Sequence, residues 1–481
     1  MKSNHINRNL DSHNHLPEDL QSFLKNLSPE DEAKLLKIVN AGKDLLGKLQ
    51  TNENEIHSLL NALEGGYTLP QFGGDVIRDG SAVLPTGRNI HAMDPWRIPS
   101  DLAMKRGAHI AEKLIEAHQE ENGIYPETIA QVLWGMDTIK TKGEPVAIIL
   151  GLFGAEPIKD GQGKISSYGL IPIEKLGRPR IDVLMTASGI FRDTFGMQMD
   201  FLDRLVQLAA SADEPHEMNF IRKHVDEIMA EKRITFEQAT ARIFTQREGD
   251  YGTYVDDQIE SSSWQEENEL GDMFIKRNSY SYGGKRSGTE NTLVLELMMK
   301  KVDRISQEID SVEYGLTDHQ HYFAQSGAMS QAVEKRSGKK VSVSYIESYT
   351  SETNIQNLDS MIRMEARTKI LNPKWYDTML KNGRSGAAEI SSRFTYLLGW
   401  SATTKSVDKW VFDESAKTFL FDEEMRNKLE KLNPEALKNM TGRMLEAAGR
   451  GLWNASEDDL EKLRELYADL EDKLEGIKVT S

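Results

Sequence analysis

Acidic and imidazole side chains that could move protons gather in two short segments of the sequence. Arg192 and Asp193 follow a strand-like run, and a second group stands in the segment 212–224. The polar residues of that second group are Glu214, His216, Asn219 and Arg222. A carboxylate or a neutral imidazole can accept a proton from a bound substrate. These residue types therefore predict acid–base chemistry, with Asp193 and Glu214 as the candidate proton acceptors.

A third segment carries two histidines separated by one residue. Asp318, His319 and His321 are followed by the aromatic pair Tyr322 and Phe323. In an extended segment, residues two apart lie on the same side of the chain. Asp318 and His321 are thus candidates for delivering a metal ion, and His321 also for accepting a proton. Two solvated surface histidines are the alternative interpretation.

Each of these groups also has a structural interpretation. Asp193 follows a strand and opens a helix, where an acid stabilises the N-terminus. Pro215 indicates a helix that begins within 213–217, so helix capping explains much of the charge in that segment. Arg443 and Arg450 lie seven residues apart on one helix face, which favours ion pairs over contacts with a ligand.

Two absences narrow the chemistry. The chain contains no cysteine, which excludes a disulfide framework, thiolate ligation of zinc or of an iron–sulfur cluster, and a cysteine nucleophile. It also lacks the G-x-x-x-x-G-K-S/T pattern, whose backbone and lysine hold the phosphates of ATP. If the process uses ATP, another chain is expected to hydrolyse it.

The overall charge argues against nucleic acid as a partner. The formal net charge is −17 at pH 7, and the basic residues are scattered among acids, whereas phosphate-binding surfaces need clustered Lys and Arg. No apolar run approaches the roughly 20 residues that span a bilayer. Residues 1–16 lack the apolar core of a secretory signal, and they fit an organellar transit peptide badly. We expect a soluble protein of a cytoplasm-like compartment, with peripheral membrane contact left open.

Helix-like and strand-like stretches follow one another along the chain. Ser28, Pro29 and Asp31 predict the start of a helix, as its N-cap, first-turn proline and capping-box acid. Hydrophobic periodicity predicts further elements. Helices are predicted for 55–64, 102–119, 195–209 and from Ser456 onward, strands for 128–134 and 181–186, and either element for 146–153.

The pattern divides the chain into four parts. A helical N-terminal segment (1–66) precedes a Gly/Pro-rich connecting loop (67–100), an α/β domain with a polar aromatic insertion (101–290) and a mainly helical C-terminal domain (291–481). Strands that alternate with helices predict a mostly parallel sheet, whose ligands bind beyond the carboxyl ends of the strands. The predicted fold class is therefore α/β, with a parallel sheet.

Several ordered segments together carry a family resemblance. They are 84–95 (LPTGRNIHAMDP), 177–183 (GRPRIDV) with 188–193 (SGIFRD), 212–224 (ADEPHEMNFIRKH), 316–323 (LTDHQHYF) and 441–453 (TGRMLEAAGRGLW). In these segments the chain resembles the C-terminal part of the large H subunit of magnesium chelatases, from about Leu59 to Gly476. The related large subunit of cobaltochelatases shares the arginine–proline–arginine strand and the phenylalanine–arginine–aspartate turn.

The resemblance implies a function and a set of site residues. It implies a porphyrin-binding component of an ATP-dependent magnesium chelatase, which inserts Mg²⁺ into protoporphyrin IX in chlorophyll or bacteriochlorophyll biosynthesis. Separate AAA+ ATPase subunits, I and D, would use the ATP, in the cytoplasm or the plastid stroma. The implied roles are catalytic for Asp193, Glu214 and His321, substrate-binding for Arg192, His216, Asn219, Arg222 and Tyr322, and metal-binding for Asp318 and His321. Because Mg²⁺ prefers oxygen ligands, carboxylates should deliver it.

Two departures keep other functions open. The long N-terminal body of the family's large subunits lacks a counterpart here, so the chain is a fragment or one piece of a split subunit. His319 is an addition, since the family usually has one histidine near Tyr322. A cobaltochelatase subunit is one alternative, although Ile90 and His91 stand where cobalt relatives usually carry aromatic residues. A non-catalytic porphyrin-binding or interaction module is the other.

Overall fold

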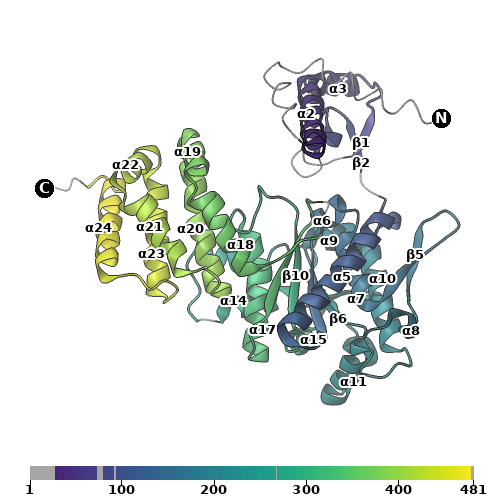
Figure 1. Cartoon of the computed structure of the whole chain (residues 1–481). Helices are drawn as coiled ribbons and strands as arrows, with labels where there is room; N and C mark the ends of the chain where they lie inside the picture. Colours follow the sequence, from purple (N-terminus) through teal and green to yellow (C-terminus); the bar gives the residue numbers. More distant parts are fainter. Residues whose placement is uncertain (1–27, 73–79, 92–93, 267, 351, 478–481) are drawn as a thin grey trace. The chain divides into compact units, whose positions relative to one another are not determined.

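The computed structural model describes residues 28–72, 80–91, 94–266, 268–350 and 352–477 (Figure 1). The chain forms two compact units, 1–93 and 94–481. The boundary between them falls inside the predicted connecting loop, and the four-part division remains a prediction. Residues 1–16, on which the expectation about targeting rests, lie outside the described residues.

The first unit is built from helices α2 (Pro29–Gln50) and α3 (Asn54–Leu63), strands β1 (Pro70–Phe72) and β2 (Asn89–His91), and the short helix η2 (Gly80–Val83). Ser28 caps α2 as predicted, because its hydroxyl accepts the backbone N–H of Asp31 at 3.2 Å. The strands pair in parallel, with Pro70 opposite Asn89.

An eight-stranded sheet forms the centre of the second unit, in the order β12-β11-β10-β3-β6-β7-β8-β9. Its strands are β3 (Thr128–Leu133), β6 (Asp182–Ala187), β7 (Ile243–Thr245), β8 (Tyr280–Gly283), β9 (Arg286–Glu290), β10 (Arg304–Ile309), β11 (Ser342–Glu347) and β12 (Ile355–Asn357). The five strands from β11 to β7 run in parallel, and the strands at both edges are antiparallel. The predicted α/β class with a mostly parallel sheet is confirmed.

Helices cover both faces of this sheet. On one face α5 and α7 pack against each other, and α7 contacts β3 and β6 (Figure 1). The helices within 94–337 are η3 (Pro95–Arg97), α5 (Asp101–Asn122), α6 (Gly135–Lys140), α7 (Glu144–Phe153), α8 (Ile173–Leu176), α9 (Gly189–Thr194), α10 (Gly196–Ala210), α11 (Phe220–Lys232), α12 (Phe236–Ala239), α13 (Val255–Glu260), α14 (Glu269–Asn278), α15 (Thr292–Met299), α16 (Gln320–Tyr322), η4 (Phe323–Gly327) and α17 (Ala328–Ser337). A hairpin of β4 (Ala155–Lys159) and β5 (Ile165–Leu170) forms a separate small sheet.

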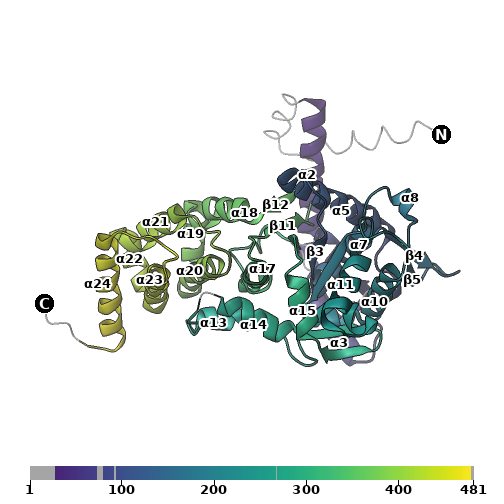
Figure 2. The ribbon, with the colours of Figure 1, turned by 90° about the horizontal axis from the view of Figure 1, so that it is seen from below.

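The second unit ends in helices that continue from the sheet toward the C-terminus, on the side opposite to the β4–β5 hairpin (Figures 1 and 2). They are α18 (Leu358–Glu365), η5 (Ala366–Ile370), α19 (Pro373–Lys381), α20 (Arg384–Thr404), α21 (Lys409–Ala416), η6 (Lys417–Phe421), α22 (Glu423–Leu432), α23 (Pro434–Gly449) and α24 (Glu457–Leu474). Arg443 of α23 and Arg450, which caps the end of this helix, both pair with Glu446 and donate to backbone carbonyls of residues 259–264. The predicted ion-pair role of these arginines is confirmed.

Three strands lie in the region that the sequence predicted to be mainly helical. Strands β10, β11 and β12 extend the sheet beyond residue 291. Strand β10 reads Arg-Ile-Ser-Gln-Glu-Ile, and all six of its residues are buried. Because a buried parallel strand is normally a continuous apolar run, these polar residues hid the strand.

A buried charge network stands at the amino ends of β3 and β6. Asp182 accepts hydrogen bonds from Arg242 at 2.9 Å and shares one with His224 at 2.9 Å, and His224 also contacts Glu127 at 3.1 Å. Burial alone would raise the pKa of Asp182, but Arg242 and His224 outweigh it and hold the pKa at about 2. Burial alone would lower the pKa of His224, but the hydrogen bonds to Asp182 and Glu127 raise it.

We predict that His224→Gln lowers the free energy of unfolding by about 1–3 kcal/mol at mildly acidic pH. Because the pKa of His224 is raised on folding, its protonated side chain contributes fully to stability below pH 6.5, the pKa of the unfolded chain. This contribution is lost as the pH rises through the pKa of the folded chain. The deficit of the variant should therefore shrink at alkaline pH in denaturant titrations. His109→Gln, at an exposed position of α5, is the control and should change little. A deficit that is independent of pH would contradict a charged His224.

Candidate functional site

The carboxyl ends of the parallel strands offer the best place for a ligand in this fold. The chain leaves β3 toward β6 and β7 on one side and later returns to β10 and β11 on the other side. Adjacent strands whose connections leave in opposite directions create a crevice at their carboxyl ends. The switch point of this sheet therefore lies between β3 and β10.

The two strands at the switch point separate toward their carboxyl ends. The β3–β10 ladder runs only from Arg304 opposite Ile129 to Ser306 opposite Gln131. By contrast, β3 pairs with β6, and β10 with β11, along all their residues. Gln131, Ser306 and Glu308 lie on one face of the sheet, because residues opposite one another or two apart share a face. Side-chain oxygens of all three have no hydrogen-bond partner among the described residues.

Four acids gather around this separation, and we refer to them as the acid group. They are Asp137 of α6, Glu144 of α7, Glu308 of β10 and Asp310 directly after β10, and all are buried. Arg106 of α5 lies 2.6 Å from Glu144, and Lys140 of α6 forms an ion pair with Asp310. Two cations thus face four acids, so the acid group has an excess of negative charge if every member is ionised.

The excess negative charge is reduced because Glu308 favours its neutral, protonated form. It is 1% exposed, and neither of its carboxylate oxygens has a hydrogen-bond partner among the described residues. Burial raises the pKa of Glu308 well above 4.5, and the negative charges of Glu144 and Asp137 raise it further. Burial also raises the pKa of Glu144, more than Arg106 lowers it. The interior of this edge can therefore hold a proton.

Arg192 and Asp193 stand at the same edge, after β6. Ser188 caps α9 by accepting the N–H of Phe191 at 3.1 Å. Arg192 is buried and donates to the backbone carbonyls of residues 246, 247 and 250, while its Nε donates to Asp193 at 2.8 Å. This hydrogen bond lowers the pKa of Asp193, and the Tyr251 hydroxyl adds a second one. Asp193 lies in the last turn of α9, so it does not stabilise the helix N-terminus as predicted.

His321 lies at this edge as a half-exposed side chain. Its Nδ1 is 3.4 Å from Asp256 of α13, and its ring is 4.4 Å from that of His319. The backbone N–H of His321 donates to His319 Nδ1, so His319 caps α16. The predicted extended segment is therefore wrong, because this cap turns the chain into a helix at Gln320. Tyr322 is buried with its ring 4.9 Å from that of Trp134.

Asp318 is engaged as a structural anchor. One of its oxygens accepts from Arg393 at 2.8 Å, and the other accepts from Lys369 and from the backbone N–H of Gly315. No cluster of three or more His, Asp or Glu side chains within the described ranges could hold a metal ion. The metal-binding role of Asp318 and His321 stays a prediction.

The remaining predicted residues lie at the opposite edge of the sheet. Arg180, just before β6, makes a bidentate pair with Glu214 at 2.8 and 2.9 Å, and Asn219 donates to Glu214 at 2.8 Å. Asn219 also caps α11 by accepting the N–H of Arg222. The predicted helix start at Pro215 is thus wrong, because α11 begins at Phe220. Asp193 and Glu214 lie beyond opposite ends of β6, whose six residues span about 20 Å.

His216 and Arg222 complete the group at the amino edge. His216 lies on the surface 2.9 Å from Asp226. Arg222 donates to the backbone carbonyls of residues 212 and 214 and holds the turn before α11. Each of these side chains thus has a partner from its own segment. The structure brings together Arg192, Asp193, His321 and Tyr322 at the carboxyl edge and keeps Glu214, His216, Asn219 and Arg222 apart from them.

Sequence reasoning missed the acid group. Glu308 and Asp310 stand in a segment without clear periodicity, and Asp137 and Glu144 flank a helix that the sequence left undecided. An acid beside an apolar residue, as in Gln307-Glu-Ile309, was the only available signal. That signal marks an unusual residue but does not tell which other acids it meets.

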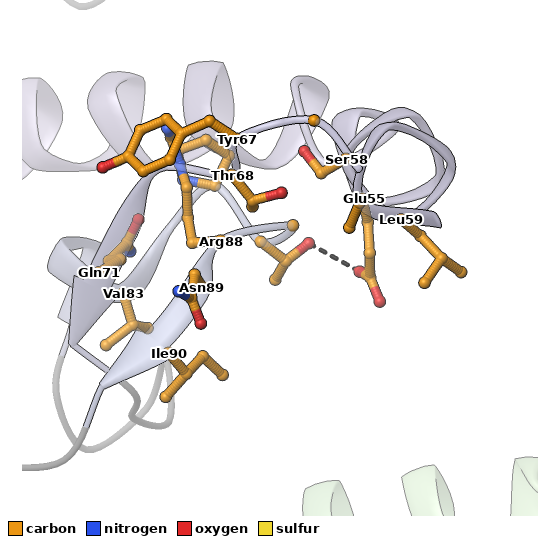
Figure 3. Close-up of a pocket in the computed structure, with 15 residues that line it drawn as sticks. Glu55, Ser58, Leu59, Tyr67, Thr68, Gln71, Val83, Arg88, Asn89 and Ile90 are labelled. Atoms are coloured by element: carbon orange, nitrogen blue, oxygen red, sulfur yellow. Dashed lines mark hydrogen bonds between the residues drawn. The ribbon is translucent and has the colours of Figure 1, made fainter. Parts of the chain in front are cut away.

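A separate cavity of about 790 Å³ lies within the first unit. Figure 3 shows Glu55, Ser58 and Leu59 on its helical side, with Tyr67 and Arg88 on the strand side. The volume suits a small molecule, and the lining is mixed polar and apolar. None of the predicted site residues lines it. Part of the segment 84–95, which carries Ile90 and His91, is not described. It is residues 92–93 and the side chain of His91.

In the part of the chain that the structure describes, no helix combines the length and the apolar character needed to cross a membrane.

The chain matches known proteins over nearly its whole length. It is 54% identical to the H subunit of the magnesium chelatase of Chlorobaculum parvum over 93% of this chain and 35% of that protein. It is 43% identical to the chloroplastic ChlH subunit of the magnesium chelatase of Oryza sativa subsp. japonica, over 89% of this chain and 31% of that protein. The chain thus spans about a third of the length of these relatives.

The fold also matches a solved structure. The catalytic subunit of cobaltochelatase from Mycobacterium tuberculosis aligns with a TM-score of 0.86 and 29% sequence identity, over 94% of this chain and 38% of that one. A family model described as CobN/Magnesium Chelatase matches residues 2–460. The chain therefore belongs to the CobN/magnesium chelatase family.

Proposed function

We propose that the chain is the porphyrin-binding component of a magnesium chelatase and takes part in inserting Mg²⁺ into protoporphyrin IX for chlorophyll or bacteriochlorophyll synthesis. Its partners would be AAA+ ATPase subunits of the I and D type, together with the rest of the large subunit, which its relatives have beyond the third that this chain matches. The cytoplasm or the plastid stroma would be its compartment. Mg²⁺ and protoporphyrin IX are substrates, and the partner subunits would use the ATP.

The observation that carries this proposal is the gathering of titratable groups at the carboxyl edge. Metal insertion breaks two pyrrole N–H bonds, and each electron pair stays on the nitrogen, which then binds the metal. The two protons must go to nearby bases. His321, half-exposed and next to Asp256, and Asp193, whose side chain is 43% exposed, can accept them from the solvent side. The buried acid group already holds a proton on Glu308, so His321 and Asp193 are the acceptors that we assign.

Magnesium is favoured over cobalt by similarity and by ligand chemistry. The chain shares 54% identity with a magnesium-chelatase subunit and 29% with a cobaltochelatase subunit. Carboxylate oxygens suit Mg²⁺, whereas imidazole and thiolate ligands suit softer metals, and the chain has no cysteine. The close structural match to a cobaltochelatase subunit keeps cobalt insertion as the second candidate. A porphyrin-binding module without activity is the third, since the chain spans about a third of its relatives.

An insertion assay tests the proposal. The purified chain is combined with its AAA+ partners, ATP and the missing portion of the large subunit, and offered Mg²⁺ or Co²⁺ together with protoporphyrin IX. We expect fluorescence of the magnesium porphyrin to appear only when this chain is present. Porphyrin binding without insertion by the complete mixture would favour the non-catalytic module. Insertion of Co²⁺ alone would favour the cobaltochelatase.

We predict that His321→Ala lowers the rate of Mg²⁺ insertion about tenfold or more, because it removes the half-exposed proton acceptor next to Asp256. His319→Ala should have a mild effect on the rate, because His319 caps α16. Initial rates in the reconstituted assay measure both. Small and equal effects would make both histidines structural, and large and equal effects would suggest a two-histidine metal site, which suits Zn²⁺ or Co²⁺.

A further inference from the structure

Large apolar side chains are exposed at the starts of α6 and α9 and in the loop after β7, all at the carboxyl edge. Met136 follows β3, Ile190 follows β6 and Tyr251 follows β7, with exposures of 43%, 48% and 55%. We refer to these three residues as the carboxyl-edge patch. Apolar side chains exposed at this edge are available to a ligand, since α/β sheets of this kind bind ligands there.

Two glycines bring the starts of α6 and α9 and the loop after β7 into contact. A Cβ atom on Gly135 would lie 2.5 Å from Cγ2 of Ile190, so the start of α6 packs directly against that side chain. A Cβ atom on Gly189 would lie 2.4 Å from Cδ1 of Tyr251, so the start of α9 packs against the tyrosine ring. Both distances are too short for any side chain at the glycine positions. The start of α9 therefore contacts both the start of α6 and the loop after β7 at this edge.

Polar groups border the patch on one side. The Arg192 guanidinium lies 5.3 Å from the centre of the Tyr251 ring, and the Tyr251 hydroxyl donates to Asp193. Both contacts fix the orientation of the exposed ring. Arg247 is exposed in the same loop as Tyr251 and is available to a carboxylate of a ligand. The patch thus combines an apolar surface with a cation at its border.

The size of the patch selects the kind of ligand. Three partly exposed side chains offer on the order of 300 Å² in total, since a whole large side chain offers about 150–250 Å². A stable protein interface needs about 800 Å² from each partner. The patch is too small for that, but it suits one face of a flat apolar molecule. A porphyrin has such a face and carries carboxylates at its edge.

We propose that the carboxyl-edge patch holds one face of the porphyrin macrocycle, with Arg247 available to a propionate. This inference rests on the proposed function and assigns the substrate to the second unit instead of to the cavity in the first unit. It also places the macrocycle beside Asp193, the exposed carboxylate that shares a hydrogen bond with Tyr251.

Matched exposed positions allow a direct test. The whole chain is titrated with a water-soluble porphyrin, deuteroporphyrin IX, and binding is followed by fluorescence. We expect Ile190→Gln and Met136→Gln each to raise Kd about three- to tenfold, and their combination to raise it further. Leu208→Gln is the control, because Leu208 has the same 48% exposure in helix α10 outside the patch. It should bind like the parent chain.

Tyr251 provides a second, independent arm. Tyr251→Phe keeps the ring and loses only the hydrogen bond to Asp193, so its affinity should stay within about twofold of the parent. Tyr251→Ser removes the ring and should weaken binding as strongly as Ile190→Gln. Thermal unfolding of each variant shows whether it is folded, and variants at these exposed sites should unfold within a few degrees of the parent.

The outcomes separate this inference from the proposed function. If the parent chain binds no porphyrin, the proposed function fails. If the parent binds and the patch variants bind like Leu208→Gln, the patch is not the site and the inference is overturned. In that case Arg88→Ala tests the cavity of the first unit, and a loss of affinity there would assign the porphyrin to that cavity.

Discussion

Replacement of Asp318 by alanine is expected to lower the free energy of unfolding by about 3–5 kcal/mol, the usual effect of breaking a buried ion pair on one side. The Asp318 side chain is 3% exposed and pairs with both Lys369 and Arg393, which are 12% and 9% exposed. Its removal leaves the partly buried Lys369 and the buried Arg393 without their shared carboxylate and frees the backbone N–H of Gly315, while Arg393 keeps its pair with Glu389.

Denaturant unfolding of the parent and the variant measures this effect. Asp213→Ala is the control, because that carboxylate is fully exposed and its pair with Arg222 is 3.3 Å long, so the change should stay within about 0.5 kcal/mol. The measurement is repeated with Mg²⁺ and with a chelator. If Asp318 is a structural anchor, Asp318→Ala loses the same unfolding free energy in both conditions. A loss that appears only with Mg²⁺ would instead support the predicted role of Asp318 as a metal ligand.

Glu308→Gln is expected to stabilise the protein increasingly as the pH rises above 4.5. Burial raises the pKa of Glu308 well above 4.5, so the folded chain keeps this proton while the unfolded chain releases it. Below pH 4.5 both the folded and the unfolded chain carry this proton, so it costs no stability. Between pH 4.5 and the folded pKa only the folded chain carries it, and the free energy of unfolding falls as the pH rises. Each pH unit in this window costs the parent about 1.4 kcal/mol. Glutamine has nearly the same volume and has no proton to lose, so the variant avoids this cost.

Unfolding titrations of parent and variant at about pH 5 and pH 8 test this prediction. The difference in unfolding free energy should grow by more than about 1.4 kcal/mol between the two conditions. Glu116→Gln, at an exposed position of α5, is the control and should show the same difference at both pH values. A constant difference for Glu308→Gln would mean that the carboxylate is ionised when folded, and the acid group would then not store a proton.

Helix ends and the central strand could be predicted from sequence because local interactions decide them. Ser28 caps α2, Ser456 caps α24, and Ile181–Thr186 is close to the observed β6 (Asp182–Ala187). A cap needs only a side-chain oxygen and an N–H three residues later. A buried strand of a parallel sheet is visible as a short apolar run that ends in a glycine-containing turn.

The stretch 146–153 could not be assigned to a helix or a strand for a physical reason. It forms most of helix α7, in which nine of ten residues are buried. An amphipathic helix is recognised by its polar face, and a helix that is buried on all sides has none. Strand β10 shows the opposite difficulty, because its buried residues are largely polar. In both cases the neighbouring elements decide the conformation.

The sequence by itself determined the family, the α/β class and the residue types available for proton transfer, because these depend on local patterns and on motifs. Only the tertiary structure decided which of these residues meet. Asp193 and Glu214 are 21 residues apart and look alike in sequence, yet they lie beyond opposite ends of β6. Glu308 and Glu144 are farther apart in sequence and come together where β3 and β10 separate. The order of strands in a sheet, which results from long-range packing, sets these distances.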